Sequence, residues 1–438
     1  IINSYNAYRL FFKALFQAHA IMKFLIFLIF YVATCHAQVE FSERVRNFSI
    51  ELLHYTQLET DGHVVISPFG IWSLMTGVAL GATGNSKAQL SRTFLLPSNQ
   101  NSIVNGYQNL TKTVLGTKTK GVQLASKNFV FIDKGFQVFD SFKRTLTSDF
   151  AAKIIELDFK DTKSAARIAN TAIEDSGASV SNVLRSEDFG AARMILTNVI
   201  SFKGLWSSPF NVSDTIIEPF YDENKKQIGQ VKMMYQRAMF PYSNIQSLNA
   251  TVMQLPYGDD NKYSMLIILP YPKIKVTEVY KKFTMITLKN ILDRLENDTK
   301  DYGLDEVDLK MPRFKISTNV ALNKPLNYMG VFDIFSPKLA SFEKITKEEI
   351  FISAIIHKAD IEVTESGTVA SAATSAYIID RISTPVFEAN RPFVYFNVNR
   401  HLGNLKKKGN VRRLEKRKEG TLFRWSFEGR DWGKRTRG

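Results

Sequence analysis

The apolar and polar positions show two periodicities, one helical and one strand-like, in segments that are intermixed along the chain. Apolar residues spaced three or four apart predict a helix from Phe41 to Tyr55. A second helix is expected to begin at Ser67-Pro68, a pair suited to a helix start, and to run toward Gly81. Period-two alternation predicts strands at Asn128–Ile132, Met194–Phe202, Tyr263–Leu269, Val307–Pro312, Ile350–Val363 and Phe393–Val398. Helices and strands follow no repeated βαβ order, which indicates an α+β fold.

The segment from Glu365 to Arg391 is unusual because residues 368–376 are small or β-branched and carry no charge. It suits either a flexible linker or a strand in the middle of a sheet. As a strand, it would alternate its side chains between two faces. An unpaired charge buried in a core costs several kcal/mol, and burial of the neutral face would avoid this cost. That face would carry Thr368, Ala370, Ala372, Thr374, Ala376 and Ile378.

Arg381 follows this run and is the only Arg or Lys between Lys358 and Arg391. An isolated Arg on a long loop suits the specificity pocket of a trypsin-like protease, where a buried Asp pairs with it. The loop therefore carries a candidate cleavage position.

Short motifs on both sides of this segment follow a recognisable order. They include Ser67-Pro68-Phe69, Thr197 to Trp206 with Phe202-Lys203-Gly204-Leu205-Trp206 at its end, Leu255-Pro256-Tyr257, Met311-Pro312-Arg313-Phe314-Lys315, His357 to Val363 and Asn390-Arg391-Pro392-Phe393. In this order and spacing the chain resembles the serpins over roughly residues 39 to 400. The resemblance implies three β-sheets, eight or nine helices and an exposed reactive-centre loop.

Inhibition of a trypsin-like serine protease is what the resemblance implies about function. The protease would cut the reactive bond Arg381–Ile382 and form a covalent complex, while the loop inserts into the central sheet. The hinge would comprise Glu365, Gly367, Thr368, Ala370, Ser371, Ala372, Ala373 and Thr374. A polar cluster under the opening of the sheet would comprise Ser67, Asn198 and His357. The alternative is a non-inhibitory serpin that acts as a carrier or structural glycoprotein.

Two features depart from the serpin pattern. The helix expected to cover the sheet has Asn170-Thr171-Ala172 where serpins usually carry Trp after Asn. At the C-terminus, Lys406, Lys407 and Lys408 stand where large apolar residues of a buried strand belong. A candidate replacement strand, Gly420–Phe427, alternates weakly and lies far from the required register.

The chain is expected to divide into an upstream segment (1–21), a signal peptide (22–37), a serpin domain (38–404) and a basic tail (405–438). Cys35, the only cysteine, lies in the signal, so the mature protein would have no disulfide. A secreted, extracellular glycoprotein is predicted, with acceptor sites at Asn47, Asn109, Asn211, Asn249 and Asn297. The apolar run of the signal is too short to span a membrane, which takes ~20 residues.

The net charge of +15 comes mostly from the ends of the chain. Residues 400–438 contribute +10 and residues 1–39 contribute +3. The nearly neutral body gives no argument for nucleic-acid binding. The tail is expected to be an alternatively spliced or wrongly assigned end; a disordered basic tail and a tail that binds a polyanion are the alternatives. A glycosaminoglycan is the partner that the last alternative implies, and Lys118 and Lys120 could extend such a patch.

The sequence contains no recognisable enzyme motif, phosphate-binding loop or metal-ligand spacing. The expectation is therefore a monomer without a cofactor or metal that is not itself an enzyme. His357 lies in a strand-like stretch beside Lys358. Its simplest interpretation is a hydrogen-bonded core histidine.

Overall fold

The structure is a computed structural model of the 438-residue chain. It describes residues 44–60, 63–116, 119–177, 180–190, 192–260, 262–283, 285–367 and 384–399. The expected signal peptide, the reactive-centre loop from residue 368 to residue 383 and the basic tail lie outside the described residues.

The described residues contain nine α-helices. The first occupies residues 44–58, and the others are α2 (Pro68–Gly81), α3 (Gly84–Thr93), α4 (Gln100–Leu115), α5 (Asp140–Arg144), α6 (Thr162–Glu174), α7 (Val276–Lys282), α8 (Leu288–Tyr302) and α9 (Asn323–Tyr328). Short turns of other helical types are η1 (Thr145–Asp149), η2 (Ser186–Asp188), η3 (Val212–Asp214), η4 (Gln246–Leu248) and η5 (Asp333–Phe335).

The largest sheet has five strands in the order β10-β11-β3-β1-β2. Their bounds are β10 (Phe314–Ala321), β11 (Ala354–Val363), β3 (Met194–Gly204), β1 (Val122–Asp133) and β2 (Ala152–Leu157). The pairs β1–β3 and β10–β11 are antiparallel, whereas β1–β2 and β3–β11 are parallel. The parallel pair β3–β11 lies at the centre of the sheet, with antiparallel neighbours on both sides.

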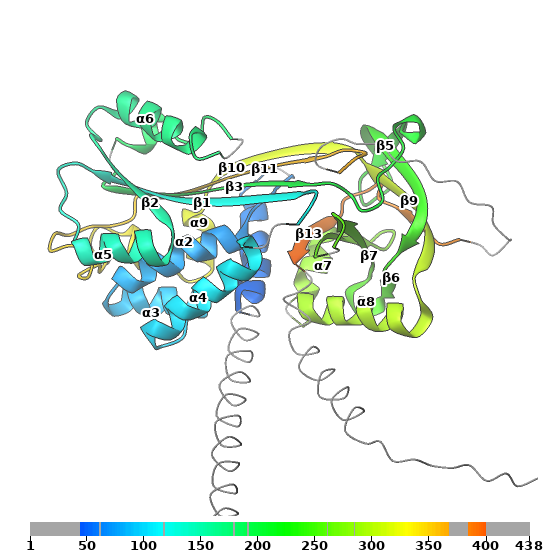
Figure 1. Cartoon of the computed structure of the whole chain (residues 1–438), viewed down its shortest axis with the longest axis horizontal. Helices are drawn as coiled ribbons and strands as arrows, with labels where there is room; N and C mark the ends of the chain where they lie inside the picture. Colours follow the sequence, from blue (N-terminus) through cyan, green and yellow to red (C-terminus); the bar gives the residue numbers. More distant parts are fainter. Residues whose placement is uncertain are drawn as a thin grey trace, which may run out of the picture.

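Two four-stranded sheets lie beside the far end of the large sheet (Figure 1). One has the order β12-β9-β5-β4 and comprises β12 (Val386–Glu388), β9 (Asp305–Pro312), β5 (Gln227–Phe240) and β4 (Ile216–Tyr221). The other has the order β13-β8-β7-β6 and comprises β13 (Val394–Asn399), β8 (Tyr263–Pro270), β7 (Ala250–Tyr257) and β6 (Tyr242–Ile245). Three sheets and nine helices confirm the predicted α+β architecture.

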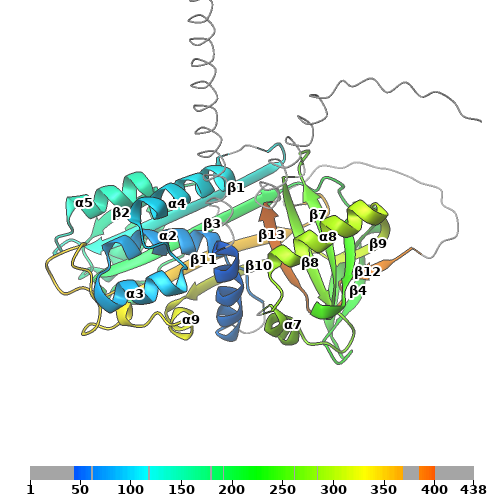
Figure 2. The same ribbon diagram turned by 90° about the horizontal axis from the view of Figure 1, so that it is seen from below.

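Part of the central sheet is buried on both faces, which explains why its strands are so apolar there: residues 128–133 of β1 and 194–199 of β3 are all buried. Helices α2, α3 and α4 cover one face, and α6 lies across the other (Figure 1). In the view from below, β2, β1, β3, β11 and β10 lie side by side behind the helices (Figure 2). Phe129, Phe131 and Ile195 pack under α6, in a different hydrophobic cluster from Val130 and Leu196, which pack on the α2 side.

Helix α2 begins and ends where the sequence predicts, although it has no polar face. The Ser67 side chain caps it by accepting a hydrogen bond from the backbone N–H of Gly70, and Pro68 occupies its first turn. Every residue from Gly70 to Gly81 is buried. Helix α2 therefore forms the centre of the core and fixes Ser67 beneath the sheet.

The strand predicted at Ile350–Val363 is longer than the strand in the structure, β11. The apolar alternation extends from Ile350 to Val363, but the strand begins only at Ala354. Ile350 and Ile352 are buried, yet the Ile352 N–H donates to the backbone of Ile334 and joins no strand ladder. The alternating pattern of buried residues therefore includes both the strand and the loop that precedes it, so the pattern alone does not show where the strand begins.

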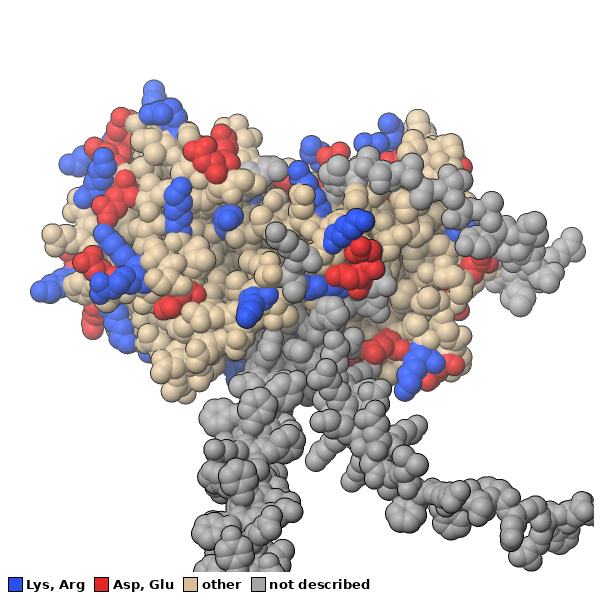
Figure 3. Space-filling view, in the orientation of Figure 1, with Lys and Arg blue, Asp and Glu red and all other residues tan. Residues whose placement is uncertain are grey.

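Charged side chains of both signs are interspersed on the face shown in Figure 3. No single-sign field covers this face, in keeping with the nearly neutral body of the chain.

Candidate functional site

The candidate site follows the seam between β3 and β11. Its upper end is a tight turn from Thr364 to Gly367, directly after β11. The Thr364 N–H donates to the Gly367 carbonyl at 2.8 Å, and the Gly367 N–H donates back at 3.1 Å. Gly367 also forms an antiparallel bridge with Leu205, which follows β3. The chain therefore reverses at the top of the seam, and Gly367 lies between the ends of the two strands.

Gly367 is required at this turn by both conformation and space. Its φ of 110° lies in a region that side chains rarely adopt. A Cβ built here would meet the carbonyl oxygen of Gly204 and lie 2.7 Å from the Cα of Leu205. The close approach of two backbones thus explains the hinge glycine.

Trp206 holds the same turn from the β3 side. Its indole Nε1 donates to the Thr364 carbonyl at 3.0 Å, and its backbone N–H donates to the Ser366 carbonyl at 3.1 Å. The indole ring stacks on Tyr257 with centroids 4.4 Å apart. The tryptophan therefore joins the turn to the apolar core beneath it.

Glu365 is buried at the tip of the turn, with 6% of its surface exposed. One carboxylate oxygen accepts a hydrogen bond from the Thr215 hydroxyl at 3.0 Å, and the other lies 3.6 Å from Nη1 of Arg313. The Glu365 carbonyl accepts from the Phe210 N–H at 2.7 Å. A buried carboxylate with these partners fixes the direction in which the chain leaves β11.

The middle of the seam holds the predicted polar cluster. His357 and Asn198 are directly opposite each other in the β11–β3 ladder, and both are buried. Nε2 of His357 accepts a hydrogen bond from the Ser67 N–H at 2.9 Å. The structure therefore brings together Ser67, Asn198 and His357, three residues far apart in the sequence.

His357 is neutral in this environment. Because Nε2 is an acceptor, the ring proton belongs on Nδ1. Burial lowers the pKa of His357 to about 3, and the backbone of Asn198 partly opposes this shift. The uncharged ring accordingly suits a core position.

The cluster extends beyond the three residues named from the sequence. Asn198 Nδ2 donates to Oδ1 of Asn128 at 2.7 Å, and Asn128 Nδ2 donates to the Ser73 hydroxyl at 2.9 Å. The Ser73 hydroxyl then donates to the Tyr107 hydroxyl at 3.0 Å. Ser73 is one of only two hydroxyl residues in the otherwise apolar α2, which could have drawn attention to it, whereas β1 carries several polar residues and Asn128 gives no such signal.

Three polar side-chain atoms on the seam make no hydrogen bond of good geometry among the described residues, although the Asn198 backbone lies near enough to the His357 ring to affect its pKa. They are Nδ1 of His357, Oδ1 of Asn198 and Oγ1 of Thr197. An unpaired buried polar atom costs about 1–3 kcal/mol. The hydrogen-bonding groups at the centre of the closed seam are therefore not all satisfied.

The covering helix α6 does not use a tryptophan. Instead, Asn170 Oδ1 accepts from the backbone N–H groups of Val183 and Leu184, while its Nδ2 donates to the Leu184 carbonyl at 2.8 Å. The Asn170 side-chain amide therefore joins the segment after α6 to the helix. The departure from the serpin pattern thus leaves the helix in place over the sheet.

The remaining predicted sites are placed only in part. The reactive bond Arg381–Ile382 and the hinge residues from Thr368 to Thr374 lie outside the described residues. Of the glycosylation acceptors, Asn249 is partly buried at the end of η4. The others, Asn47, Asn109, Asn211 and Asn297, are exposed.

No group of three or more His, Cys, Asp or Glu in the described ranges is placed to hold a metal ion. No helix within those ranges has the length and apolar character needed to cross a bilayer.

Comparisons with known proteins identify the family. The Serpin (serine protease inhibitor) family model matches residues 43–412. The chain is 32% identical to leukocyte elastase inhibitor of Bos taurus over 357 residues, covering 80% of this chain and 93% of that protein. It is 31% identical to glia-derived nexin of Mus musculus over 345 residues, covering 76% and 83%. The chain therefore belongs to the serpin family of serine protease inhibitors.

A solved structure of human thyroxine-binding globulin has the same fold. The TM-score is 0.72 at 23% sequence identity, and the alignment covers 84% of this chain and 96% of that one. At this identity the similarity concerns the fold alone.

Proposed function

We propose that this serpin is a secreted inhibitor of a trypsin-like serine protease, cleaved after Arg381 and completed by insertion of its loop between β3 and β11. The single observation that carries the proposal is the Gly367 turn, which bridges to Thr364 and Leu205 at once. It places Gly367 between the ends of the two parallel strands, which favours insertion of the following residues between them.

Extension of both ladders supports insertion in one register. A strand that continues from Gly367 runs antiparallel to β3 and to β11, which are parallel to each other. On the β11 side, Thr368 falls opposite Val363, and each later residue pairs one position earlier on β11. The same residue numbers follow from the β3 side, because β3 and β11 are themselves in register.

This register places the neutral set of loop residues on the core side of the sheet. Ile355, His357, Ala359, Ile361 and Val363 are the buried alternation of β11. Opposite them would come Thr368, Ala370, Ala372, Thr374 and Ala376. Burial of these side chains introduces no charge, which favours rapid insertion.

The polar cluster has a defined place in the same register. Thr374 would lie between His357 and Asn198, and its hydroxyl can both donate and accept. Nδ1 of His357 is a donor and Oδ1 of Asn198 is an acceptor, and each has no partner in the described residues. Insertion would therefore bring the Thr374 hydroxyl beside these two unpaired groups.

Trapping depends on competition between insertion and hydrolysis. The protease serine would attack the Arg381 carbonyl, form an ester and release the amine of Ile382. Insertion would then carry the esterified Arg381 away from the loop's original position. Displacement of reacting groups by ~1 Å can cost ~100-fold in rate, so gross distortion would stall deacylation.

The decisive experiment mixes the protein with a panel of Arg-specific serine proteases. We expect a protease–inhibitor complex that survives SDS, and mass spectrometry should place the cut between Arg381 and Ile382. Arg381→Ala should abolish the complex with these proteases. A principal cut elsewhere would contradict the assignment of the reactive bond.

Secretion and glycosylation are part of the proposal. The exposed acceptors Asn47, Asn109, Asn211 and Asn297 support glycan attachment, since a bulky sugar requires an exposed side chain. Expression in secretory cells should deliver protein that begins after Ala37 and loses mass on N-glycosidase treatment. Retention inside the cells without mass change would contradict it.

A carrier or structural glycoprotein is the alternative, since one structural neighbour is a thyroxine-binding globulin. The uncharged hinge favours inhibition, because a carrier has no need for a loop that can be buried. Cleavage at Arg381 without a stable complex would favour the alternative.

A further inference from the structure

A groove of about 350 Å³ lies where strands of two different sheets meet, close to the Thr364–Gly367 turn. Its lining comes from β5, from the junction of β9 and β10, and from β11. We call it the basic groove, because three basic side chains and one acidic side chain line it: Lys232, Arg313, Lys315 and Glu362. The lining therefore carries a charge of +2, although the body of the chain is nearly neutral.

The backbone fixes the positions from which these side chains extend. The Arg313 N–H donates to the Lys232 carbonyl at 2.8 Å, directly after the end of the β5–β9 ladder. Lys315 lies opposite Glu362 in the β10–β11 ladder. The basic groove is therefore built on regular strands of both sheets, and its cations come from two of them and from the residue that joins β9 to β10.

The three basic side chains have hydrogen-bond donors available. Within the described residues, none of them donates a hydrogen bond. Nη1 of Arg313 lies 3.6 Å from Glu365, and Nζ of Lys315 lies 3.6 Å from Glu362, whereas Lys232 has no ionic partner in the same residues. Solvent-exposed ion pairs contribute little free energy, so a ligand that binds these cations loses little by displacing their present partners.

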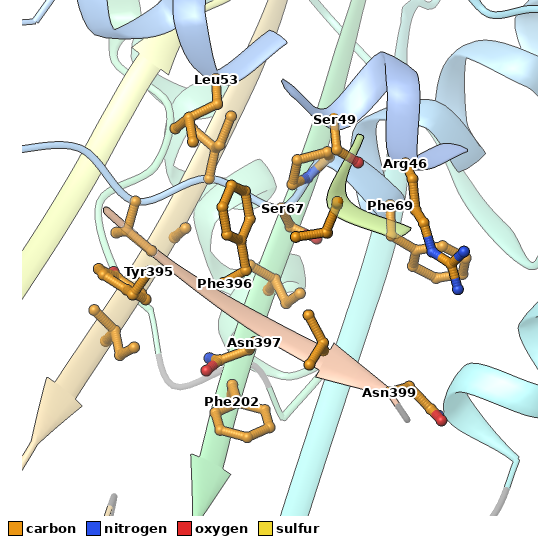
Figure 4. Close-up of a pocket in the computed structure, with 18 of the residues that line it drawn as sticks. Arg46, Ser49, Leu53, Ser67, Phe69, Phe202, Tyr395, Phe396, Asn397 and Asn399 are labelled. Carbon is orange, nitrogen blue, oxygen red and sulfur yellow. The ribbon is translucent and has the colours of Figure 1, made fainter. Parts of the chain in front are cut away.

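Phe314 adds an apolar surface to the basic groove and connects it to the core. Its ring centroid lies 6.1 Å from that of Phe393 and 5.8 Å from that of Tyr395. Tyr395 itself lines a separate apolar space beside β13, which Figure 4 shows. The two spaces share no lining residue. Aromatic packing therefore holds the segment between Arg313 and Lys315 in place.

We propose that the basic groove binds a tetrahedral dianion, namely phosphate or sulfate, either as the free ion or as an ester on a small molecule. A guanidinium presents a planar fork of donors that binds such oxyanions in a bidentate manner, and each ammonium group adds a point charge. One water occupies about 30 Å³ of liquid. The groove therefore has room for the ion and for the group that carries it.

Two carboxylates compete with the dianion for the cations of the groove. Glu365 is buried and keeps a second partner in the Thr215 hydroxyl, whereas Glu362 is exposed. Removal of the Glu362 charge should therefore tighten anion binding without disturbing the core. The proposal concerns binding alone and is independent of the proposed protease inhibition.

Two charge variants of the full chain test the proposal as a matched pair. Lys315→Gln and Glu362→Gln break the same ion pair, so a purely structural role of the pair would change both variants in the same direction. We expect Lys315→Gln to weaken sulfate binding by roughly fivefold and Glu362→Gln to tighten it by a similar factor. The affinity follows from the rise in thermal midpoint during a sodium sulfate titration at constant ionic strength. Changes in the same direction would overturn the proposal.

A second pair separates the basic groove from general effects of the salt. Sulfate stabilises many proteins because it is excluded from their surface, and this effect is common to all variants. Lys226→Gln removes an exposed lysine of the same β4–β5 hairpin that does not line the groove. Lys232→Gln should lose most of the specific rise in thermal midpoint, and Lys226→Gln should keep it. Equal rises in the two variants would overturn the proposal.

The same titration distinguishes the sources of the dianion. Inorganic phosphate and a sulfated disaccharide are compared with sulfate, each on the native chain and on Lys232→Gln. Tighter binding of the disaccharide that depends on Lys232 would assign the groove to a sulfated sugar, and equal or weaker binding would assign it to the free ion. If none of the three binds in a way that depends on Lys232, the proposal is wrong.

Discussion

The backbone N–H of Ser67 donates a hydrogen bond to Nε2 of His357 at 2.9 Å, joining the start of α2 to the middle of β11. This bond requires a neutral imidazole, because a protonated ring has no acceptor nitrogen. The contact therefore makes the seam between β3 and β11 sensitive to pH.

Acid is expected to destabilise the native state through His357. Burial lowers the pKa of His357 from 6.5 to about 3, so the unfolded state binds the proton more readily. The stability from the neutral ring is fully present above pH 6.5 and is lost as the pH falls toward 3. The loss is about 1.4 kcal/mol per pH unit in this window, or about 2 kcal/mol at pH 5. Urea unfolding at pH 7.5 and 5.0 measures it.

His357→Gln should flatten this pH dependence, since the amide can accept from Ser67 but does not titrate near pH 6. His63→Gln, at an exposed histidine, is the matched control and should leave it unchanged. An unaltered slope in His357→Gln would show that another group dominates.

Gly367→Ala is expected to weaken the turn at the top of the seam. The added Cβ meets the backbone of Gly204 and Leu205, and φ is 110°. Gly303 has a similar φ of 90° but nothing within 4 Å of a built Cβ. Gly303→Ala therefore measures backbone strain alone, about 1–3 kcal/mol. Denaturant unfolding should show a larger loss for Gly367→Ala; equal losses would mean that the turn can move aside.

Much of the central architecture could be predicted from the sequence because burial on a strand or helix leaves a periodic pattern. The helix at 44–58 and the strands β3, β8 and β9 were found in this way. Helix α2 is buried all round, and its start was found from Ser67-Pro68 instead. The beginning of β11 was misplaced because Ile350 and Ile352 are buried by a loop that alternates like a strand.

The site was less predictable because its contacts join distant parts of the chain. Serpin resemblance named Ser67, Asn198 and His357, but no local pattern showed that Trp206 holds the turn at Thr364.

Thr368→Arg should turn the inhibitor into a substrate. In the proposed register Thr368 enters the core side opposite Val363, which is 1% exposed. Burial of an unpaired guanidinium costs several kcal/mol, so insertion should stall. Cleavage at Arg381 should continue while the SDS-stable complex disappears. Val369→Arg, on the opposite face beside exposed Glu362, should retain most of the complex; equal trapping by both variants would contradict the assigned faces.

Thr374→Val should raise the number of inhibitor molecules consumed per protease molecule trapped. Valine keeps the shape of threonine but brings no hydroxyl to Nδ1 of His357 and Oδ1 of Asn198, which then stay unpaired after insertion. One unpaired buried group costs about 1–3 kcal/mol. If part of that cost falls on the insertion barrier, insertion slows by roughly tenfold for each 1.4 kcal/mol. Titration of protease activity measures the stoichiometry.

Thr374→Ser is the matched control, since it keeps the hydroxyl and loses only a methyl group. It should trap protease at nearly the native stoichiometry. Cleaved Thr374→Val should also gain less thermal stability over its uncleaved form than the cleaved native chain does, because the inserted strand leaves the seam unsatisfied. Equal stoichiometry for Thr374→Val and Thr374→Ser, with equal gains on cleavage, would show that the hydroxyl does not reach the cluster and that the register is different.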